Sequence, residues 1–237
     1  TLVTFAADER AADALIAEIG SAAETARRPL EDLDWSVRWR DGLGPRHFGR
    51  LTVVPSWIAK PRNPDDTTVV LDPETAFGSG EHGSTRAALR LLERLTCPGD
   101  RVLDLGSGSG ILAIAAIKLG ARLAIGIEND AEANDVAERN AERNGVAAKM
   151  ELLHGDAGDL APLAGPVDLL LSNILRTVNT DLLPSIVGAL RPGGIAIFSG
   201  MEETEAELFR PLLAGAGLEP LDEVVDTGWW AVAARRT

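Results

Sequence analysis

The stretch that decides the fold runs from Val102 to Ala116 and reads VLDLGSGSGILAIAA. An apolar strand containing an acidic residue is followed by three alternate glycines and then by an alanine-rich helix. Such a turn lets main-chain N–H groups approach a ligand closely, with the positive end of the helix dipole behind them. The spacing is GxGxG and not GxGxxG, so it matches the nicotinamide and flavin fingerprint poorly.

With Asp104 two residues before Gly106, the turn resembles the S-adenosylmethionine (AdoMet) loop of the Rossmann-like methyltransferases. Glu128 ends the next apolar run, where nucleotide-binding folds place a carboxylate for ribose hydroxyls. A nicotinamide-binding protein stays a remote alternative, which affinity for NADH would reveal.

Composition restricts the class of protein. The chain has 237 residues, 45% of them hydrophobic and 25% charged, which is enough for one substantial core and a small appended unit. A net charge of −13 argues against nucleic acid as the main partner, because phosphate contacts need a basic surface. The charge suits a basic protein substrate, and it also suits a surface that simply keeps the protein soluble.

Cysteine content and hydropathy exclude further classes of protein. The single cysteine, Cys97, rules out an internal disulfide and a cysteine-built metal site. No apolar run approaches the length of a membrane span, and no signal-peptide pattern opens the sequence, so we expect a cytoplasmic protein without a membrane partner. The sequence does not fix the oligomeric state, and we expect a monomer or a weak oligomer.

Two segments are predicted, with the division near Asn63–Asp66. Residues 1–62 form a short α/β appendage with a helix over about 8–26, and residues 63–237 form the catalytic domain. The appendage contains three tryptophans, Trp35, Trp39 and Trp57. Their side chains either pack the appendage against the catalytic domain or form a recognition surface.

After residue 66, strand and helix patterns alternate, which predicts an α/β fold with a doubly wound, mostly parallel, seven-stranded Rossmann-like sheet. A tight connection at 226–229 predicts a final hairpin and one antiparallel strand. We expect strands at 68–72, 101–105, 123–128, 149–154, 167–172, 194–199, 219–226 and 229–235, and helices at 84–95, 110–119, 131–144, 178–190 and 203–216.

Ligands of such sheets bind at the carboxyl ends of the strands, and the polar and glycine residues of this chain gather there. Gly106, Ser107 and Gly108 follow one strand, Glu128 the next, and Asp156 and Asn173 two further ones. Each has a plainer explanation as well. Glu128 could be an exposed acid, Asp156 a turn former, Asp104 a helix cap and Asn173 an Asx turn.

A second motif, AFGSGEHGST at residues 76–85, carries a narrower identification. Together with NIL at 173–175, NAERNG at 140–145 and GILAIAA at 110–116, it resembles the PrmA family. These enzymes methylate lysine and N-terminal amines of the eleventh large-subunit ribosomal protein. The likeness extends from about Trp35 to the end of the sequence.

The resemblance implies an AdoMet-dependent protein N-methyltransferase that acts on a basic ribosomal protein. Thr85 and Gly106 are expected to contact AdoMet and Glu128 its ribose, while Asn173 lies beside the transferable methyl and orients the acceptor amine. The predicted catalytic residue is Asn173 and no metal ligand is expected. The predicted cofactor-binding residues are Phe77, Gly78, Thr85, Asp104, Gly106, Ser107, Gly108, Glu128, Asn129, Asp156, Ala157 and Asn173.

The front of the chain departs from the family pattern. Family members usually carry a compact α+β recognition domain there, whereas few residues precede Trp35 in this sequence. Residues 176–178 also differ from the usual small residues. Two alternatives therefore stay open: an N-methyltransferase for another protein or a small amine, and a non-catalytic AdoMet-binding partner module.

His82 has several possible roles. As a metal ligand it lacks partners at a suitable spacing, and a general base is also conceivable. Helix capping or lining of the cofactor pocket is the preferred interpretation. For Trp229 and Trp230 we expect one ring in the core and one at the surface.

Overall fold

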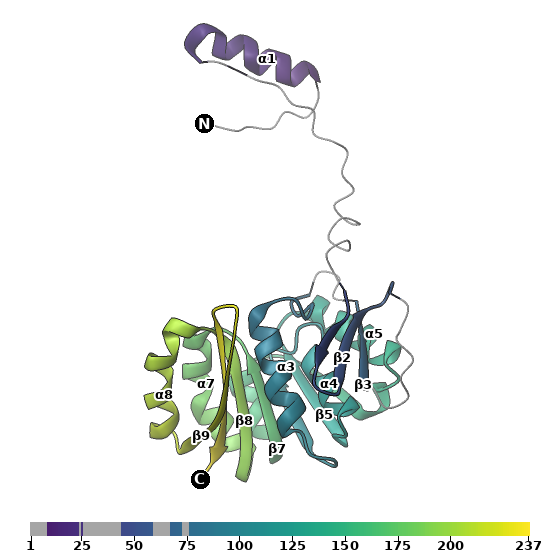
Figure 1. Cartoon of the computed structure of the whole chain (residues 1–237), viewed down its shortest axis with the longest axis vertical. Coiled ribbons are helices and arrows are strands. Elements are labelled where there is room, and N and C mark those ends of the chain that lie inside the picture. Colours follow the sequence, from purple (N-terminus) through teal and green to yellow (C-terminus); the bar gives the residue numbers. More distant parts are fainter. Residues whose placement is uncertain (1–8, 24, 26–43, 59–66, 73–75) are drawn as a thin grey trace. The chain divides into compact units, whose positions relative to one another are not determined.

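The computed structural model describes residues 9–23, 25, 44–58, 67–72 and 76–237 (Figure 1). It contains two compact units, Thr1–Gly42 and Leu43–Thr237. The first unit holds helix α1 (Glu9–Ile19), which a short 3-10 turn (Gly20–Ala22) extends, within the range of the predicted helix. Trp35, Trp39 and the predicted boundary near residues 63–66 lie outside the described residues.

The second unit is built on a seven-stranded sheet that confirms the predicted α/β architecture. In spatial order, the strands are β6 (Met150–His154), β5 (Leu123–Glu128), β4 (Arg101–Leu105), β7 (Val167–Asn173), β8 (Leu190–Glu202), β10 (Trp229–Arg236) and β9 (Leu218–Asp226). β10 is the one antiparallel strand of this sheet and forms a hairpin with β9, as the 226–229 connection predicts.

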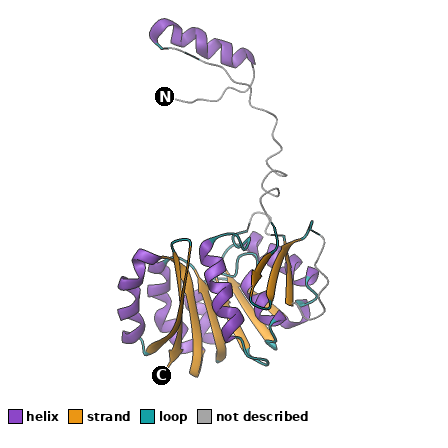
Figure 2. Ribbon diagram, in the orientation of Figure 1, coloured by secondary structure: helices purple, strands orange, loops and turns teal. Residues whose placement is uncertain are grey.

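Helices cover both faces of this sheet (Figure 2). The helices are α3 (Gly83–Leu95), α4 (Ile111–Lys118), α5 (Ala131–Arg143), α6 (Ala157–Ala164), α7 (Arg176–Ala189) and α8 (Ala206–Gly215), with 3-10 turns at Ala147–Lys149 and Glu203–Glu205. One core lies between the sheet and α3, α4 and α5, and the other between the sheet and α6, α7 and α8.

A smaller sheet adds to the first core. It contains β1 (Arg46–Phe48), β2 (Leu51–Pro55) and β3 (Thr67–Leu71), and β2 pairs with β3 in parallel. Leu51, Val53 and Val69 are buried in the same cluster as the helix face of α3. The predicted division after residue 62 runs between β2 and β3, whereas the compact units divide after Gly42.

Three local features differ from the prediction. Helix α6 was not predicted, because it has only eight residues and contains Pro162. Strand β8 begins at Leu190 and includes the Arg191–Gly194 segment that was expected to be a turn. β3 pairs within the small sheet and not with the seven strands. Among the described residues, no helix is long and apolar enough to cross a membrane.

Candidate active site

The carboxyl ends of β4, β5, β6 and β7 lie side by side, and a cavity of about 550 Å³ opens at this edge of the sheet. This volume falls within the range of roughly 300–1,000 Å³ that is usual for small-molecule sites. Gly106, Glu128 and Asn173, predicted from three different strand ends, share this one cavity. The predicted residues that line it are Phe77, Gly106, Gly108, Glu128, Asn129, Asp156, Ala157 and Asn173.

The turn after β4 needs its glycines. Gly106 and Gly108 have φ values of 65° and 51°, which side chains rarely adopt. A Cβ on Gly108 would lie 2.7 Å from the carbonyl oxygen of Phe77, and one on Gly106 would lie 2.8 Å from the side chain of Ile174. The close packing brings the main chain to the cavity, as the glycine spacing predicts.

Glu128 is held by the main chain around it. Its Oε2 accepts a hydrogen bond from the Gly108 N–H at 3.0 Å, and its Oε1 accepts from the N–H groups of Asn129 and Asp130 at 2.9 and 3.2 Å. Each carboxylate oxygen has more than one lone pair, so capacity to accept from ligand hydroxyls remains. We call the part of the lining formed by Gly106, Gly108, Glu128, Gly155 and Asp156 the glycine wall.

Asp104 lies behind the glycine wall and does not line the cavity. It is buried, and its Oδ2 accepts from the Ala113 N–H at 3.1 Å, so it ties the end of β4 to the start of α4. Burial raises the pKa of this carboxyl from 3.8 to about 7, and the negative charge of Glu128 adds to the effect. This contact with the first turn of α4 corresponds to the helix-capping explanation that the sequence offered for Asp104.

Three other predicted residues also lie behind the cavity lining. The carbonyl of Gly78 accepts from the Ser109 hydroxyl at 2.7 Å, and this contact joins the 76–82 loop to the turn after β4. Ser107 is buried, and its hydroxyl has no hydrogen-bond partner among the described residues. Thr85 is buried in the first turn of α3.

Asn173 ends β7 and lines the cavity. Its Nδ2 donates to the Thr85 hydroxyl at 3.3 Å, while its Oδ1 is buried and has no hydrogen-bond partner in the described part of the chain. A buried acceptor without a partner is costly, and such groups are uncommon outside functional sites. The Asn173 amide therefore keeps an acceptor that no described residue uses.

A buried amide fixes the turn that follows Asn173. Asn179 donates from Nδ2 to the carbonyls of Ile174 and Ser199 at 3.0 and 3.1 Å, and its Oδ1 accepts from the Ser172 hydroxyl at 2.6 Å. A side chain on Gly200 would overlap the main chain of Ile174. Sequence reasoning did not identify Asn179 or Gly200, because their contacts depend on the packing of β8 against the turn.

Three aromatic side chains form a second part of the lining, which we call the aromatic wall: Phe77, His82 and Trp229. The ring centroids of His82 and Trp229 are 4.2 Å apart, and those of Phe77 and His82 are 5.5 Å apart. His82 lines the cavity, and pocket lining was one of its two preferred interpretations from the sequence. Trp230 is buried, whereas Trp229 lines the cavity.

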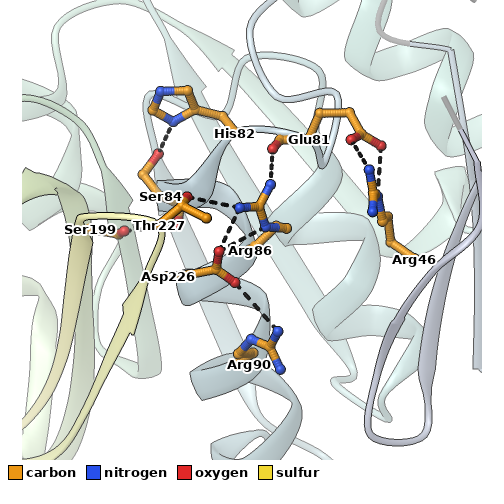
Figure 3. A network of polar contacts seen from close by, with 9 residues as sticks. All are labelled: Arg46, Glu81, His82, Ser84, Arg86, Arg90, Ser199, Asp226 and Thr227. Atoms are coloured by element: carbon orange, nitrogen blue, oxygen red, sulfur yellow. Dashed lines mark hydrogen bonds and ion pairs between the residues drawn. The ribbon is translucent and has the colours of Figure 1, made fainter. Parts of the chain in front are cut away.

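A hydrogen bond holds the His82 ring. Its Nδ1 shares a hydrogen bond of 2.8 Å with the Ser84 hydroxyl (Figure 3). Burial lowers the pKa of His82, and the charge of Arg86 lowers it further. His82 occupies the N-cap position of α3 without a capping side-chain bond. Within the described ranges, no three His, Cys, Asp or Glu residues are grouped to hold a metal ion.

The cavity has further lining residues that were not among the predicted cofactor contacts. Gly155, Ile174 and Leu175 follow predicted strands, so their positions could be anticipated, whereas Trp229 and Gly200 come from the distant β10 and β8. Arg176 belongs to the 176–178 segment, which departs from the family pattern, and its Nε pairs with Glu205 Oε1 at 3.0 Å. The remaining lining residues are His82, Ser84, Ile127, Gly155, Ile174, Leu175, Val178, Leu182, Gly200 and Trp229.

The comparisons of the sequence with known proteins agree on one family. A family model described as ribosomal protein L11 methyltransferase (PrmA) matches residues 4–237. The ribosomal protein L11 methyltransferase of Pelotomaculum thermopropionicum is 40% identical over 217 residues, which are 91% of this chain and 70% of that protein. The enzyme of the same name from Thermus thermophilus is 40% identical over 205 residues, 86% of this chain and 78% of its own length.

A solved structure agrees with the sequence comparisons. The crystal structure of the ribosomal protein L11 methylase from Lactobacillus delbrueckii subsp. bulgaricus superposes with a TM-score of 0.74 at 32% identity. The match covers 82% of this chain and 99% of that one.

Proposed function

Because the chain belongs to the ribosomal protein L11 methyltransferase (PrmA) family, we propose that it transfers methyl groups from AdoMet to amine nitrogens of that ribosomal protein. The observation that carries the proposal is the shared cavity. It combines a glycine turn, a strand-end carboxylate and an asparagine with an unpartnered carbonyl oxygen at adjacent strand ends. The alternative explanations of these residues do not require them to meet in one cavity.

The glycine wall fits a nucleoside. The close approach at Gly108 leaves no room for a side chain, so only the main chain borders the cavity at that point. Glu128 is the residue that would bind the ribose hydroxyls, since its carboxylate already lies against the glycine turn. Asn129, Asp156 and Ala157 follow β5 and β6 and would surround the rest of the nucleoside.

Gly106 and Asn173 would contact the methionine end of the cofactor. Asp104, Gly78 and Thr85 would act from behind the lining by holding the main chain and the Asn173 side chain. Ser107 would act through its main chain, whose carbonyl accepts from the Gly110 N–H at 2.8 Å. When bound, AdoMet supplies an electrophilic methyl group on a sulfonium that leaves readily.

The residues of the chain then orient the acceptor. An amine nitrogen attacks only with a free lone pair, so the acceptor ammonium first loses a proton to solvent. Asn173 Oδ1 accepts one N–H of the neutral amine and so directs the lone pair. Leu175 and Val178 line the cavity with apolar side chains that are exposed in the free protein. An acceptor protein that covers them would exclude water, and a dry site favours the neutral amine over the ammonium.

The proposed acceptor is a lysine or α-amino group of a basic protein. The net charge of −13 on this chain attracts such a partner over long range. The relatives named above are ribosomal protein L11 methyltransferases, which makes L11 the proposed substrate.

The test is to incubate the chain with AdoMet carrying a labelled methyl group and a complete set of bacterial ribosomal proteins. We expect label on L11, at lysine or N-terminal amines. Label on another protein would contradict the proposed substrate and keep the chemistry. AdoMet binding in calorimetry without label on any acceptor would support the non-catalytic module, and no AdoMet binding would overturn the proposal altogether.

A further inference from the structure

The aromatic wall is positioned by segments that are far apart in the sequence. His82 immediately precedes α3, whereas Trp229 is the first residue of β10, directly after the turn of the β9–β10 hairpin. Thr227 in this turn has a φ of 49°, which is unusual for a residue with a branched side chain. The position of Trp229 therefore depends on whatever holds this turn against α3.

Arg86, at the end of the first turn of α3, makes that connection (Figure 3). Its Nε and Nη2 donate to Asp226 Oδ1 at 3.0 and 2.5 Å, and Nη2 also donates to the Thr227 hydroxyl at 2.9 Å. Its Nη1 donates to the main-chain carbonyl of Glu81, in the loop that carries His82. One planar guanidinium thus joins the hairpin turn to the loop before α3.

The contact is largely shielded from water. The side chains of Arg86 and Asp226 are 18% and 10% exposed, so their attraction is screened less than that of a surface pair. Arg90 adds a weaker contact to Asp226 Oδ2 at 3.4 Å, and Asp226 would keep this partner without Arg86.

Main chains meet at the same point. A Cβ on Gly83 would lie 2.6 Å from the Asp226 carbonyl oxygen, the Thr227 hydroxyl and the Trp229 ring. The first turn of α3 and the hairpin turn therefore touch with no space for adjustment. A shift of the hairpin turn moves Trp229 directly, and His82 stacks against it.

We propose that Arg86 is a positioning residue for the acceptor: it fixes the aromatic wall while remaining outside the cavity lining. The inference rests on the proposed function. The first turn of α3 also carries Thr85, whose hydroxyl holds the Asn173 amide, so His82 and Trp229 lie on the same side as the residue that receives the amine, while Phe77 remains a predicted cofactor contact. The nucleoside contacts lie on the glycine wall, which Arg86 does not touch.

Replacing Arg86 should therefore separate acceptor use from cofactor binding. For Arg86→Gln we expect roughly a tenfold to hundredfold loss in kcat/KM for the acceptor protein, as for a small misplacement of a reacting group. The dissociation constant of AdoMet should stay at the wild-type value. Hydrogen exchange measured by mass spectrometry should become faster in residues 224–230 and stay unchanged in β4 and β5.

Arg94→Gln is the matched control. Arg94 Nη2 pairs with Asp222 Oδ2 at 3.2 Å and so joins the same helix α3 to the same strand β9. It lies about two helical turns from Arg86, away from the hairpin turn. This variant should keep wild-type kcat/KM and wild-type exchange in residues 224–230.

Arg86→Lys keeps the charge but not the planar fork, and it serves if Arg86→Gln does not fold. We expect a loss in kcat/KM of the same kind and of smaller size. Wild-type kcat/KM or wild-type exchange in the Arg86 variants would overturn the proposal, as would a parallel loss of AdoMet affinity. If the wild-type chain binds AdoMet but methylates no protein, the proposed function fails, and the exchange data still decide whether Arg86 holds the turn.

Discussion

The two walls of the cavity are built in different ways. The glycine wall consists of main chain and strand-end carboxylates, each placed by a strand and turn that are local in sequence. The aromatic wall consists of side chains from the 76–82 loop and from the start of β10, which meet where α3 packs against the β9–β10 hairpin and Arg86 pairs with Asp226. The difference teaches that, on the proposed function, cofactor binding would depend on local motifs and presentation of the acceptor on tertiary contacts.

The carboxyl groups next to the two walls also differ, because their pKa values are shifted in opposite directions. Behind the glycine wall, the carboxyl of Asp104 is buried without a cation and its pKa is raised to about 7. Beside the aromatic wall, the hydrogen bonds from Arg86 lower the pKa of Asp226, and Arg90 lowers it further. The two carboxyls should therefore make stability depend on pH in opposite directions.

The largest expected effect comes from Asp104. Between its ordinary value of 3.8 and about 7, the folded state keeps this carboxyl protonated while the unfolded state loses the proton. Stability therefore falls as pH rises through this window, by at most about 4 kcal/mol. Asp104→Asn should flatten this slope and be more stable than wild type above pH 7. Urea unfolding across the window measures it, and an unchanged slope would mean that Asp104 is not the titrating group.

Asn173→Ala should give the next largest effect. Without the Oδ1 acceptor, the amine is no longer oriented, and we expect kcat to fall about a hundredfold or more. AdoMet affinity should remain largely intact, because the nucleoside contacts lie on the glycine wall. A turnover assay and calorimetry on the same sample make the comparison. Equal losses in both would place Asn173 with the cofactor and remove the functional distinction between the walls.

Glu128→Ala should have the reverse profile. The removal of a charged acceptor is worth about 1.5–3 kcal/mol, so the AdoMet dissociation constant should rise by about tenfold to a hundredfold. With saturating AdoMet, kcat should be close to that of wild type. Glu128→Gln retains one acceptor oxygen and should lie between the two proteins. Unchanged affinity in Glu128→Ala would count against the ribose assignment.

The same contrast explains how far the sequence could be interpreted. The strand ending at Leu105, the glycine turn and Glu128 were predicted because each signal lies within one strand–turn–helix unit. Trp229 was not placed in the cavity, because a single sequence does not show that β10 inserts between β8 and β9. Gly200 was not placed there, because its contact with Ile174 depends on how β8 packs against the turn after β7. The contact between Arg86 and Asp226 could not be predicted either, because the two residues are far apart along the chain.

The smallest expected effect concerns Asp226. Its lowered pKa means that the ionised form stabilises the folded state above the ordinary value of 3.8, and that this contribution is lost as pH falls below it. Asp226→Asn should therefore make the acid limb of the stability profile shallower, whereas Asp104→Asn changes the limb between 3.8 and about 7. Urea unfolding of both variants and of the double variant checks this. The two walls share no ionisable partner for these groups, so their effects should add. Non-additive values would show that the hairpin turn and the buried carboxyl are coupled, and that the cavity responds to pH as one unit.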